Sequence, residues 1–146
     1  MLSTIVKIRV RYCDVDRMGY LHHGNYADYF EVGRTELLRR QGLSYKEIED
    51  NGIILPVRKL SIEYYGPAKY DDLIDIKTSL VQMEGIRLVF HYEVTNSENK
   101  LLCEGKTTLV FADRETGRPR KVPDFFRDKM HQIGVNLDGI SQTKNL

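Results

Sequence analysis

The hydrophobic period of this sequence changes near Gly52, and this change limits the folds that the chain can adopt. Before it, apolar and small side chains recur at three- and four-residue steps over residues 26–41, which predicts one long amphipathic helix. Alternation with a period of two, over residues 4–12 and in four segments after Gly52, predicts five antiparallel strands joined in part by tight turns. The four later strands are expected over residues 59–64, 74–80, 88–94 and 101–111. This order indicates an α+β protein in which one sheet buries one principal helix.

Capping residues mark the ends of two expected helices. Asn25 is suited to cap the N-terminus of the long helix, and Gly42 is suited to close its C-terminus in the left-handed conformation. Ser44, followed three residues later by Glu47, forms a capping box. A second, short helix is therefore expected to begin there and to end near Asn51.

The composition is that of an ordinary globular domain. With 146 residues and 41% hydrophobic side chains, one domain is expected over residues 1–133, and residues 134–146 are expected to form a mobile tail. The 22 Lys+Arg against 21 Asp+Glu leave a formal charge of +1, which gives no general attraction to nucleic acid or an anionic membrane. No segment approaches the roughly 20 apolar residues of a membrane span. Two cysteines, Cys13 and Cys103, and no targeting segment favour a reducing, cytoplasmic location.

A sheet that buries one helix leaves a second face to be covered. Val81, Val89 and Leu109 occupy alternate positions of three expected strands and are assigned to this outer face. Contiguous exposed apolar surface is unusual in a monomer. The sequence therefore predicts a homo-oligomer that covers part of the outer face.

The most distinctive chemistry lies in the loop over residues 13–25. Asp14, Asp16, His22 and His23 all lie within ten residues, directly before the long helix. The N-terminus of a helix presents unpaired backbone N–H groups and the positive end of the helix dipole, so it stabilises an oxyanion. An ionised aspartate nearby can act as a base or a nucleophile. This combination points to acyl transfer.

Other interpretations of these residues stay open. The aspartates can stabilise turns, and the histidines can be exposed loop residues. A metal site of Asp, His and His is disfavoured because adjacent histidines point in different directions in an extended loop. Cys13 lacks the glycine-framed elbow that would present a nucleophile. The tripeptide Gly105-Lys106-Thr107 is rejected as a phosphate-binding loop because the first glycine is missing and the tripeptide falls in a strand pattern.

A basic cluster follows the last long strand. Arg118, Arg120 and Lys121 lie around Pro119. Such a cluster is either a solvated turn or a clamp for a phosphate-bearing ligand. The residues alone leave both interpretations open.

Residues 12–26, with the sequence YCDVDRMGYLHHGNY, and residues 29–34 resemble the signature of the 4-hydroxybenzoyl-CoA thioesterase family, and within it the YbgC-like branch. The resemblance covers residues 4–125 and continues through Tyr64, Pro67, Asp72, Gly117, Arg118, Pro119 and Pro123. It implies a hotdog fold, in which an antiparallel five-stranded sheet wraps around one long central helix. It also implies a homodimer whose sheets join edge to edge, or a homotetramer, with the active site at the dimer interface.

The resemblance also assigns roles to the loop residues. Asp16 matches the catalytic carboxylate of the family, a nucleophile or general base. His23 matches a histidine of the YbgC-like branch, and its backbone N–H matches the donor that polarises the thioester carbonyl. The other residues expected to bind substrate are Tyr12, Gly24, Asn25 and Tyr26.

The activity that the resemblance implies is hydrolysis of a short- to medium-chain or aromatic acyl-CoA to the free acid and CoA. It requires no metal and no cofactor, since the coenzyme is part of the substrate. The coenzyme phosphates are expected beside Arg118, Arg120 and Lys121, and Arg87 is a further candidate. Three alternatives stay open: an acyl-carrier-protein thioesterase, a hotdog dehydratase that moves protons on a β-hydroxyacyl thioester, and a non-catalytic acyl-CoA-binding protein.

Overall fold

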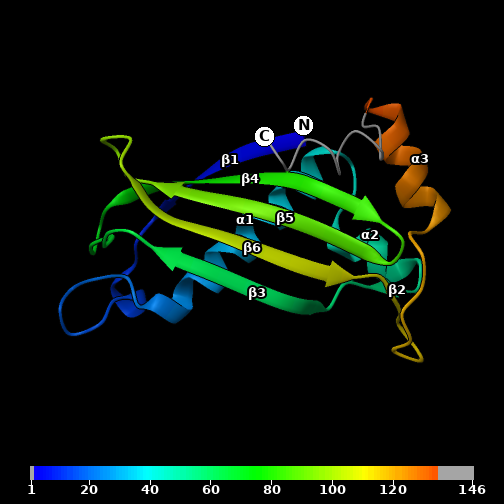
Figure 1. The fold of residues 1–146 in the computed structure, drawn as a ribbon, viewed down its shortest axis with the longest axis horizontal. Helices are drawn as coiled ribbons and strands as arrows, with labels where there is room; N and C mark the ends of the chain where they lie inside the picture. Colours follow the sequence, from blue (N-terminus) through cyan, green and yellow to red (C-terminus); the bar gives the residue numbers. More distant parts are fainter. Residues whose placement is uncertain (1, 135–146) are drawn as a thin grey trace.

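The computed structural model describes residues 2–134 (Figure 1). Its strands are β1 (Leu2–Arg9), β2 (Ile53–Ile54), β3 (Val57–Tyr64), β4 (Leu73–Glu84), β5 (Arg87–Thr95), β6 (Leu101–Val110) and β7 (Ala112–Asp113). Its helices are α1 (Tyr26–Arg40), α2 (Tyr45–Asp50) and α3 (Asp124–Gln132), with two short 3-10 turns, η1 (Tyr12–Asp14) and η2 (His23–Asn25). Five strands form one antiparallel sheet in the order β1-β4-β5-β6-β3, and β2 pairs with β7. The expected five-stranded antiparallel sheet with one long helix is confirmed.

The long helix α1 lies along one face of this sheet (Figure 1). Two glycines allow a close approach between helix and sheet. A Cβ atom on Gly33 of α1 would overlap Thr78 of β4, and a Cβ atom on Gly105 of β6 would overlap the ring of Phe30. Phe30 instead stacks on Tyr92 of β5, with ring centroids 4.2 Å apart. The amphipathic pattern of the helix therefore corresponds to a tightly packed interface.

The predicted helix ends are confirmed at three of four positions. Gly42 adopts a φ of +79°, and the Ser44 hydroxyl accepts the backbone N–H of Glu47 at 3.2 Å. The short helix α2 ends at Asp50, with Asn51 as its C-cap. The expected side-chain cap at Asn25 is wrong. Asn25 has helical backbone angles, whereas a capping residue is extended, and its side-chain Nδ2 donates to the carbonyl of Asp14 at 2.9 Å.

Some elements differ from those expected from the hydrophobic period. β1 ends at Arg9, so Tyr12 lies in the turn η1 and not in a strand. The pair β2–β7 consists of two residues on each side, which is too short to show any period. The hydrophobic period of the sequence did not predict the helix α3. Two of its residues, Phe126 and Met130, lie four positions apart and are both buried in the core.

The assignment of Leu109 to the outer face is wrong. Leu109 lies opposite Leu88, and both residues belong to the buried core cluster. In β6 apolar residues occupy both faces, so the alternation alone does not show which face is turned toward α1. Val81 lies at an irregularity in the register between β4 and β5, and Val89 is 3% exposed.

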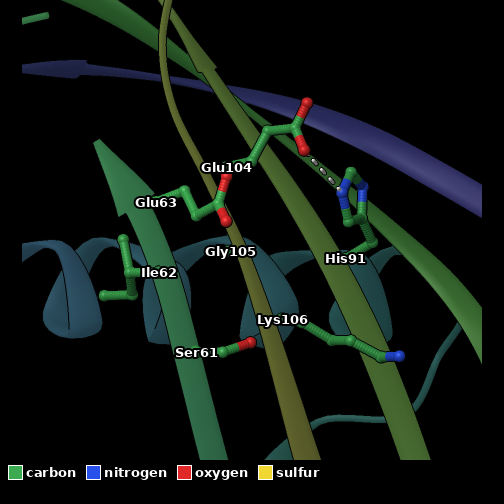
Figure 2. Close-up of a pocket in the computed structure, with 7 residues that line it drawn as sticks. All are labelled: Ser61, Ile62, Glu63, His91, Glu104, Gly105 and Lys106. Carbon is green, nitrogen blue, oxygen red and sulfur yellow. Dashed lines mark ion pairs between the residues drawn. The ribbon is translucent and has the colours of Figure 1, made fainter. Parts of the chain in front are cut away.

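The outer face carries many polar and charged side chains. Figure 2 shows it in front of α1, with Glu63, Glu104, His91 and Lys106 projecting from the strands. Glu104 lies directly opposite both Glu63 and Glu93 in the strand register. The Nε2 atom of His91 lies 3.8 Å from a carboxylate oxygen of Glu104. This charged surface is separated by the thickness of the sheet from α1.

Residues 135–146, which make up nearly all of the expected tail, lie outside the described part of the chain. Among the helices of residues 2–134, none is long and apolar enough to cross a membrane. The helix α3 is the last described element and ends at Gln132.

Candidate active site

The loop before α1 folds back on itself as a small hairpin. The carbonyl of Asp14 accepts the N–H of His22 at 2.9 Å, and the N–H of Asp16 donates to the carbonyl of Tyr20 at 2.8 Å. Gly19 makes the turn with a φ of +77°, a conformation that favours glycine. The hairpin brings Asp14 and Asp16 opposite the residues that lead into the helix.

Asp14 is the residue that ties this hairpin to α1. It is 8% exposed, and its carboxylate accepts hydrogen bonds from Arg11 Nε at 3.0 Å and from the Tyr29 hydroxyl at 2.9 Å. The Cys13 thiol also donates to it, at 3.5 Å. Its backbone carbonyl accepts from the side chain of Asn25 at 2.9 Å. These bonds fix the start of the helix relative to the loop.

The hydrogen bond from Arg11 is the main reason why the pKa of Asp14 lies below its ordinary value. Burial acts in the opposite direction, and the hydrogen bond from Tyr29 again favours the ionised form. Burial and this same bond to Asp14 raise the pKa of Tyr29. Because its carboxylate is ionised, buried and fully used in hydrogen bonds, Asp14 is positioned for a structural role.

Asp16 has a different environment. One carboxylate oxygen, Oδ1, accepts the backbone N–H of Met18 at 2.8 Å and that of Tyr20 at 3.2 Å. Within residues 2–134 the other oxygen, Oδ2, has no hydrogen-bond donor, and the residue is half-buried. The backbone thus holds the carboxylate in one orientation while one oxygen stays available for chemistry.

The residues that enter the helix present backbone donors. His22 Nδ1 accepts the N–H of Gly24 at 3.1 Å, and the carbonyl of His22 accepts the N–H of Asn25 at 2.9 Å. No acceptor for the N–H of His23 lies in the described part of the chain. The hydroxyl of Tyr64, the last residue of β3, donates to the carbonyl of His23 at 2.8 Å. The peptide groups around His23 are therefore anchored on one side and free to donate on the other.

A pocket of about 680 Å³ opens at Asp16, lined by Tyr12, Val15, Asp16, Arg17, Gly19 and Tyr70. Tyr12 and Asp16 therefore line the same pocket. His23, Gly24 and Asn25 do not line this pocket, although His23 and Gly24 are exposed. Tyr26 is 2% exposed and packs edge-on against Tyr64, so it contributes to the core.

Tyr70 lines the same pocket and was not among the candidate site residues predicted from the sequence. It lies in the connection between β3 and β4, and its ring meets that of Tyr12 edge-to-face with centroids 5.6 Å apart. Neither a periodic pattern nor a capping motif marks this position. Its aromatic character alone gives no signal, because the chain contains nine tyrosines.

The basic cluster lies far from Asp16 within one chain. The N–H of Arg120 donates to the carbonyl of Phe111, and the carbonyl of Arg118 accepts from Asp113. These bonds place the cluster beside β7, at the opposite end of the sheet from the loop that carries Asp16 (Figure 1). All three basic residues, Arg118, Arg120 and Lys121, are exposed. Arg87 lies at the start of β5 and lines a separate pocket on the outer face.

The remaining candidates occupy structural positions. Residues 2–134 contain no group of three or more His, Cys, Asp or Glu residues that could hold a metal ion. Cys13 is exposed. Cys103 is buried, and this burial is the largest cause that raises the pKa of its thiol to about 12. Gly105 lies in the middle of β6 against Phe30, which is not the geometry of a phosphate-binding loop.

This combination of fold and loop defines a protein class. Residues 10–130 match the family model described as the thioesterase-like superfamily, and the chain belongs to that family. YbgC of Escherichia coli, an acyl-CoA thioester hydrolase, is 37% identical over 116 residues, which cover 80% of this chain and 87% of YbgC. The acyl-CoA thioesterase YbgC of Haemophilus influenzae is 29% identical over 116 residues, covering 79% of this chain and 83% of that protein.

The structural comparison agrees with the sequence comparison. The DHNA-CoA thioesterase of Staphylococcus aureus superposes with a TM-score of 0.85 at 32% identity, covering 91% of each chain. The chain therefore has the hotdog fold of these thioesterases and is a thioester hydrolase. The resemblance read from residues 12–26 is confirmed at the level of the family.

Proposed function

We propose that this enzyme hydrolyses acyl-CoA to the free acid and CoA, with Asp16 as the catalytic carboxylate and the His23 N–H as a donor to the thioester carbonyl. The main support is the environment of Asp16, whose carboxylate is oriented by two backbone N–H groups and opens into a pocket with Oδ2 available. The unpaired N–H of His23, close to the start of α1, is suited to stabilise an oxyanion. Short- to medium-chain and aromatic acyl groups are the proposed substrates.

Two routes are compatible with this arrangement. As a general base, Asp16 takes a proton from water while the water oxygen attacks the carbonyl carbon. The tetrahedral intermediate then breaks its C–S bond, and the leaving thiolate recovers that proton. As a nucleophile, Asp16 attacks the carbonyl carbon itself and releases the thiolate, and water then cleaves the mixed anhydride. In both routes negative charge develops on the carbonyl oxygen that the His23 N–H contacts.

Release of free thiol from a panel of short, long, aliphatic and aromatic acyl-CoA esters tests the proposal. We expect turnover of at least one class by the wild type and a loss on the order of 10²-fold or more in Asp16→Asn. His23→Ala should lose less, because a backbone donor does not depend on the side chain. Near-normal turnover by Asp16→Asn would remove Asp16 from the mechanism.

The alternatives make different predictions in the same experiment. A carrier-protein thioesterase would hydrolyse the acyl-carrier-protein ester and leave the coenzyme ester intact. A dehydratase would remove water from a β-hydroxyacyl thioester without releasing thiol. A binding protein would bind acyl-CoA tightly without turnover.

We further propose that the chain forms a homodimer through the edge of β3, and that this dimer completes the site. β3 is an edge strand of eight residues, and Val57, Leu60 and Tyr64 on it are each more than 40% exposed. Exposed edges of this length readily pair with another strand. A two-fold axis would pair β3 antiparallel with β3 of a second copy. A homotetramer built from two such dimers is the larger assembly that the resemblance implies.

Such a dimer would bring the basic cluster of one protomer toward Asp16 of the other. The Asp16 loop contacts the end of β3 through Tyr64, while Val110 and Arg114 contact Pro56 and Gly52, just before its start. Eight residues of strand separate these two ends by roughly 25 Å. Antiparallel pairing of the two β3 strands places the start of one beside the end of the other. We propose that Arg118, Arg120 and Lys121 hold the coenzyme phosphates of the partner's substrate.

Mixed dimers test this arrangement. One variant carries Asp16→Asn, and the other carries Arg118→Glu with Arg120→Glu, which should raise the KM for acyl-CoA more than it lowers kcat. After unfolding and refolding together, random pairing makes about a quarter of all sites intact if the clamp acts across the dimer. If the clamp acts within one chain, mixing restores nothing. Recovery of a low KM in the mixture is therefore the expected result.

We propose that the reaction needs no metal or separate cofactor and that it takes place in the cytoplasm. A carboxylate and a backbone N–H are sufficient for thioester hydrolysis by either route. Turnover should survive prolonged incubation with EDTA, and loss of activity that Zn²⁺ or another divalent ion restores would contradict this. The exposed free thiol of Cys13 is typical of a reducing compartment.

A further inference from the structure

Two tyrosines form the aromatic wall of the pocket at Asp16. Tyr12, from η1, and Tyr70, from the β3–β4 connection, meet edge-to-face with an interplanar angle of 86°. Both rings are exposed, Tyr12 to 79% and Tyr70 to 51%. Rings as exposed as these bury little apolar area, so the stability of the fold gives no strong reason for the pair. A ligand that covers them would gain the hydrophobic contribution that folding leaves unused.

The backbone holds Tyr70 firmly in this place. The N–H of Tyr70 donates to the carbonyl of Gly19 at 3.0 Å, and Lys69 forms a β-bridge with Tyr20. The N–H of Leu21 donates to the carbonyl of Ala68 at 2.8 Å. The connection between β3 and β4 is therefore bonded to the hairpin that carries Asp16, and Tyr70 keeps a fixed relation to the carboxylate.

The residue after Tyr70 adopts an unusual conformation. Asp71 has a φ of +69°, one of two non-glycine residues in residues 2–134 with a positive φ. Its N–H donates to the carbonyl of Val10 at 3.0 Å, and its carbonyl accepts from the Arg9 guanidinium at 2.8 Å. Left-handed backbone at a non-glycine residue persists where the surroundings determine it, and such positions concentrate at functional sites. Here it directs the chain just after the tyrosine that faces the pocket.

From this geometry we propose that Tyr70 is a specificity-determining residue, which together with Tyr12 favours planar aromatic acyl groups over saturated chains of similar size. The inference rests on the proposed acyl-CoA hydrolysis and names the substrate class of that same site. An edge-to-face pair leaves ring faces available for stacking. A flat acyl group gains aromatic contacts beyond its buried area, whereas a saturated chain gains only the area.

The ratio of kcat/KM for benzoyl-CoA to that for hexanoyl-CoA measures this preference. Tyr70→Leu removes the ring and keeps apolar bulk, so we expect the ratio to fall on the order of 3- to 10-fold, mainly through a higher KM for benzoyl-CoA. Tyr70→Phe keeps the ring and should retain the ratio of the wild type. Ile5→Ala is the matched control, because Ile5 on β1 is equally exposed, at 51%, and does not line the pocket.

An unchanged ratio in Tyr70→Leu, or an equal loss for both esters, would overturn the proposal. The melting temperature of each variant shows whether it is folded. If Tyr70→Leu does not fold, Tyr70→Val takes its place. If the wild type hydrolyses neither these two esters nor any other ester of the panel, the proposed function fails. Dissociation constants for the non-hydrolysable benzoyl and hexanoyl thioether analogues of CoA then give the same ratio and test Tyr70 separately.

Discussion

At the scale of single residues, Asp14 and Asp16 are two nearby acids that lie in different environments. Asp14 is buried, and its carboxylate is occupied by Arg11 and Tyr29. Asp16 is half-buried at a pocket, with a carboxylate oriented by backbone N–H groups. A catalytic carboxylate needs an oxygen that can reach the substrate, and only the second environment offers one.

The lowered pKa of Asp14 predicts how stability depends on pH. Its folded-state pKa lies below the unfolded value, so its contribution is complete above about pH 4 and is lost as the pH falls through the folded pKa. Asp14→Asn should therefore lower the free energy of unfolding at pH 7 by about 1–3 kcal/mol, toward the low end because Arg11 is exposed. The difference from wild type should shrink toward pH 3.

Denaturant unfolding of both proteins at pH 7, 5 and 3 measures this dependence. Tyr29→Phe removes one of the same hydrogen bonds and should show a smaller effect in the same direction. A destabilisation by Asp14→Asn that stays constant from pH 7 to pH 3 would contradict the assignment.

The sequence indicated some of the site residues but not all. Asp16, His23 and Tyr12 belong to one contiguous motif, so a family resemblance is enough to select them for testing. Tyr70 reaches the same pocket through bonds between two loops that are about fifty positions apart in the chain. The contact of Asn25 with Asp14 likewise depends on the hairpin, whereas a helix-start pattern alone suggests a cap.

At the scale of elements, the packing of α1 on the sheet depends on two glycines. Gly105→Ala should destabilise the protein by about 1–3 kcal/mol, because the new methyl group would overlap the ring of Phe30, which is stacked on Tyr92. Gly66→Ala is the matched control, since its Cβ would lie 3.6 Å from the nearest atom, an ordinary contact. The change in melting temperature compares the two. Equal effects of both substitutions would show that the close packing of Phe30 on Gly105 does not limit the stability of the protein.

Long strands, which repeat the alternating pattern several times, were predictable from the sequence, and strands of two residues were not. β4, β5 and β6 each span nine or more residues, so alternation is visible over several repeats. β2 and β7 form only where tertiary contacts bring the two segments together. Because β6 carries apolar residues on both faces, the sequence did not show which of them point toward α1. In the structure, the pairing of Leu109 with Leu88 assigns Leu109 to that inward face.

At the scale of the whole molecule, charges are separated although the net charge is only +1. The exposed cations Arg118, Arg120 and Lys121 lie beside β7. This end of the sheet is opposite the loop that carries Asp16 (Figure 1). We propose that this local cluster holds the anionic coenzyme although the protein as a whole is nearly neutral. The proposed dimer would bring the two ends together.

Ionic strength should affect this cluster more than the reaction itself. Between about 0.05 and 0.5 M salt, screening of exposed cations should raise the KM for acyl-CoA several-fold with a smaller change in kcat. The same acyl group on N-acetylcysteamine lacks the phosphates and serves as the control. Equal salt effects on both esters would argue against a phosphate clamp.

We propose that Asp16, and not its neighbour Asp14, performs the chemistry. The most direct test is the single-turnover rate of thiol release from the preferred acyl-CoA with the enzyme in saturating excess, measured for wild type, Asp16→Asn and Asp14→Asn at pH 7, with each melting temperature. We predict that Asp16→Asn keeps its melting temperature and loses about 10²-fold or more in rate. A stable Asp16→Asn protein that releases thiol at the rate of the wild type would contradict the account.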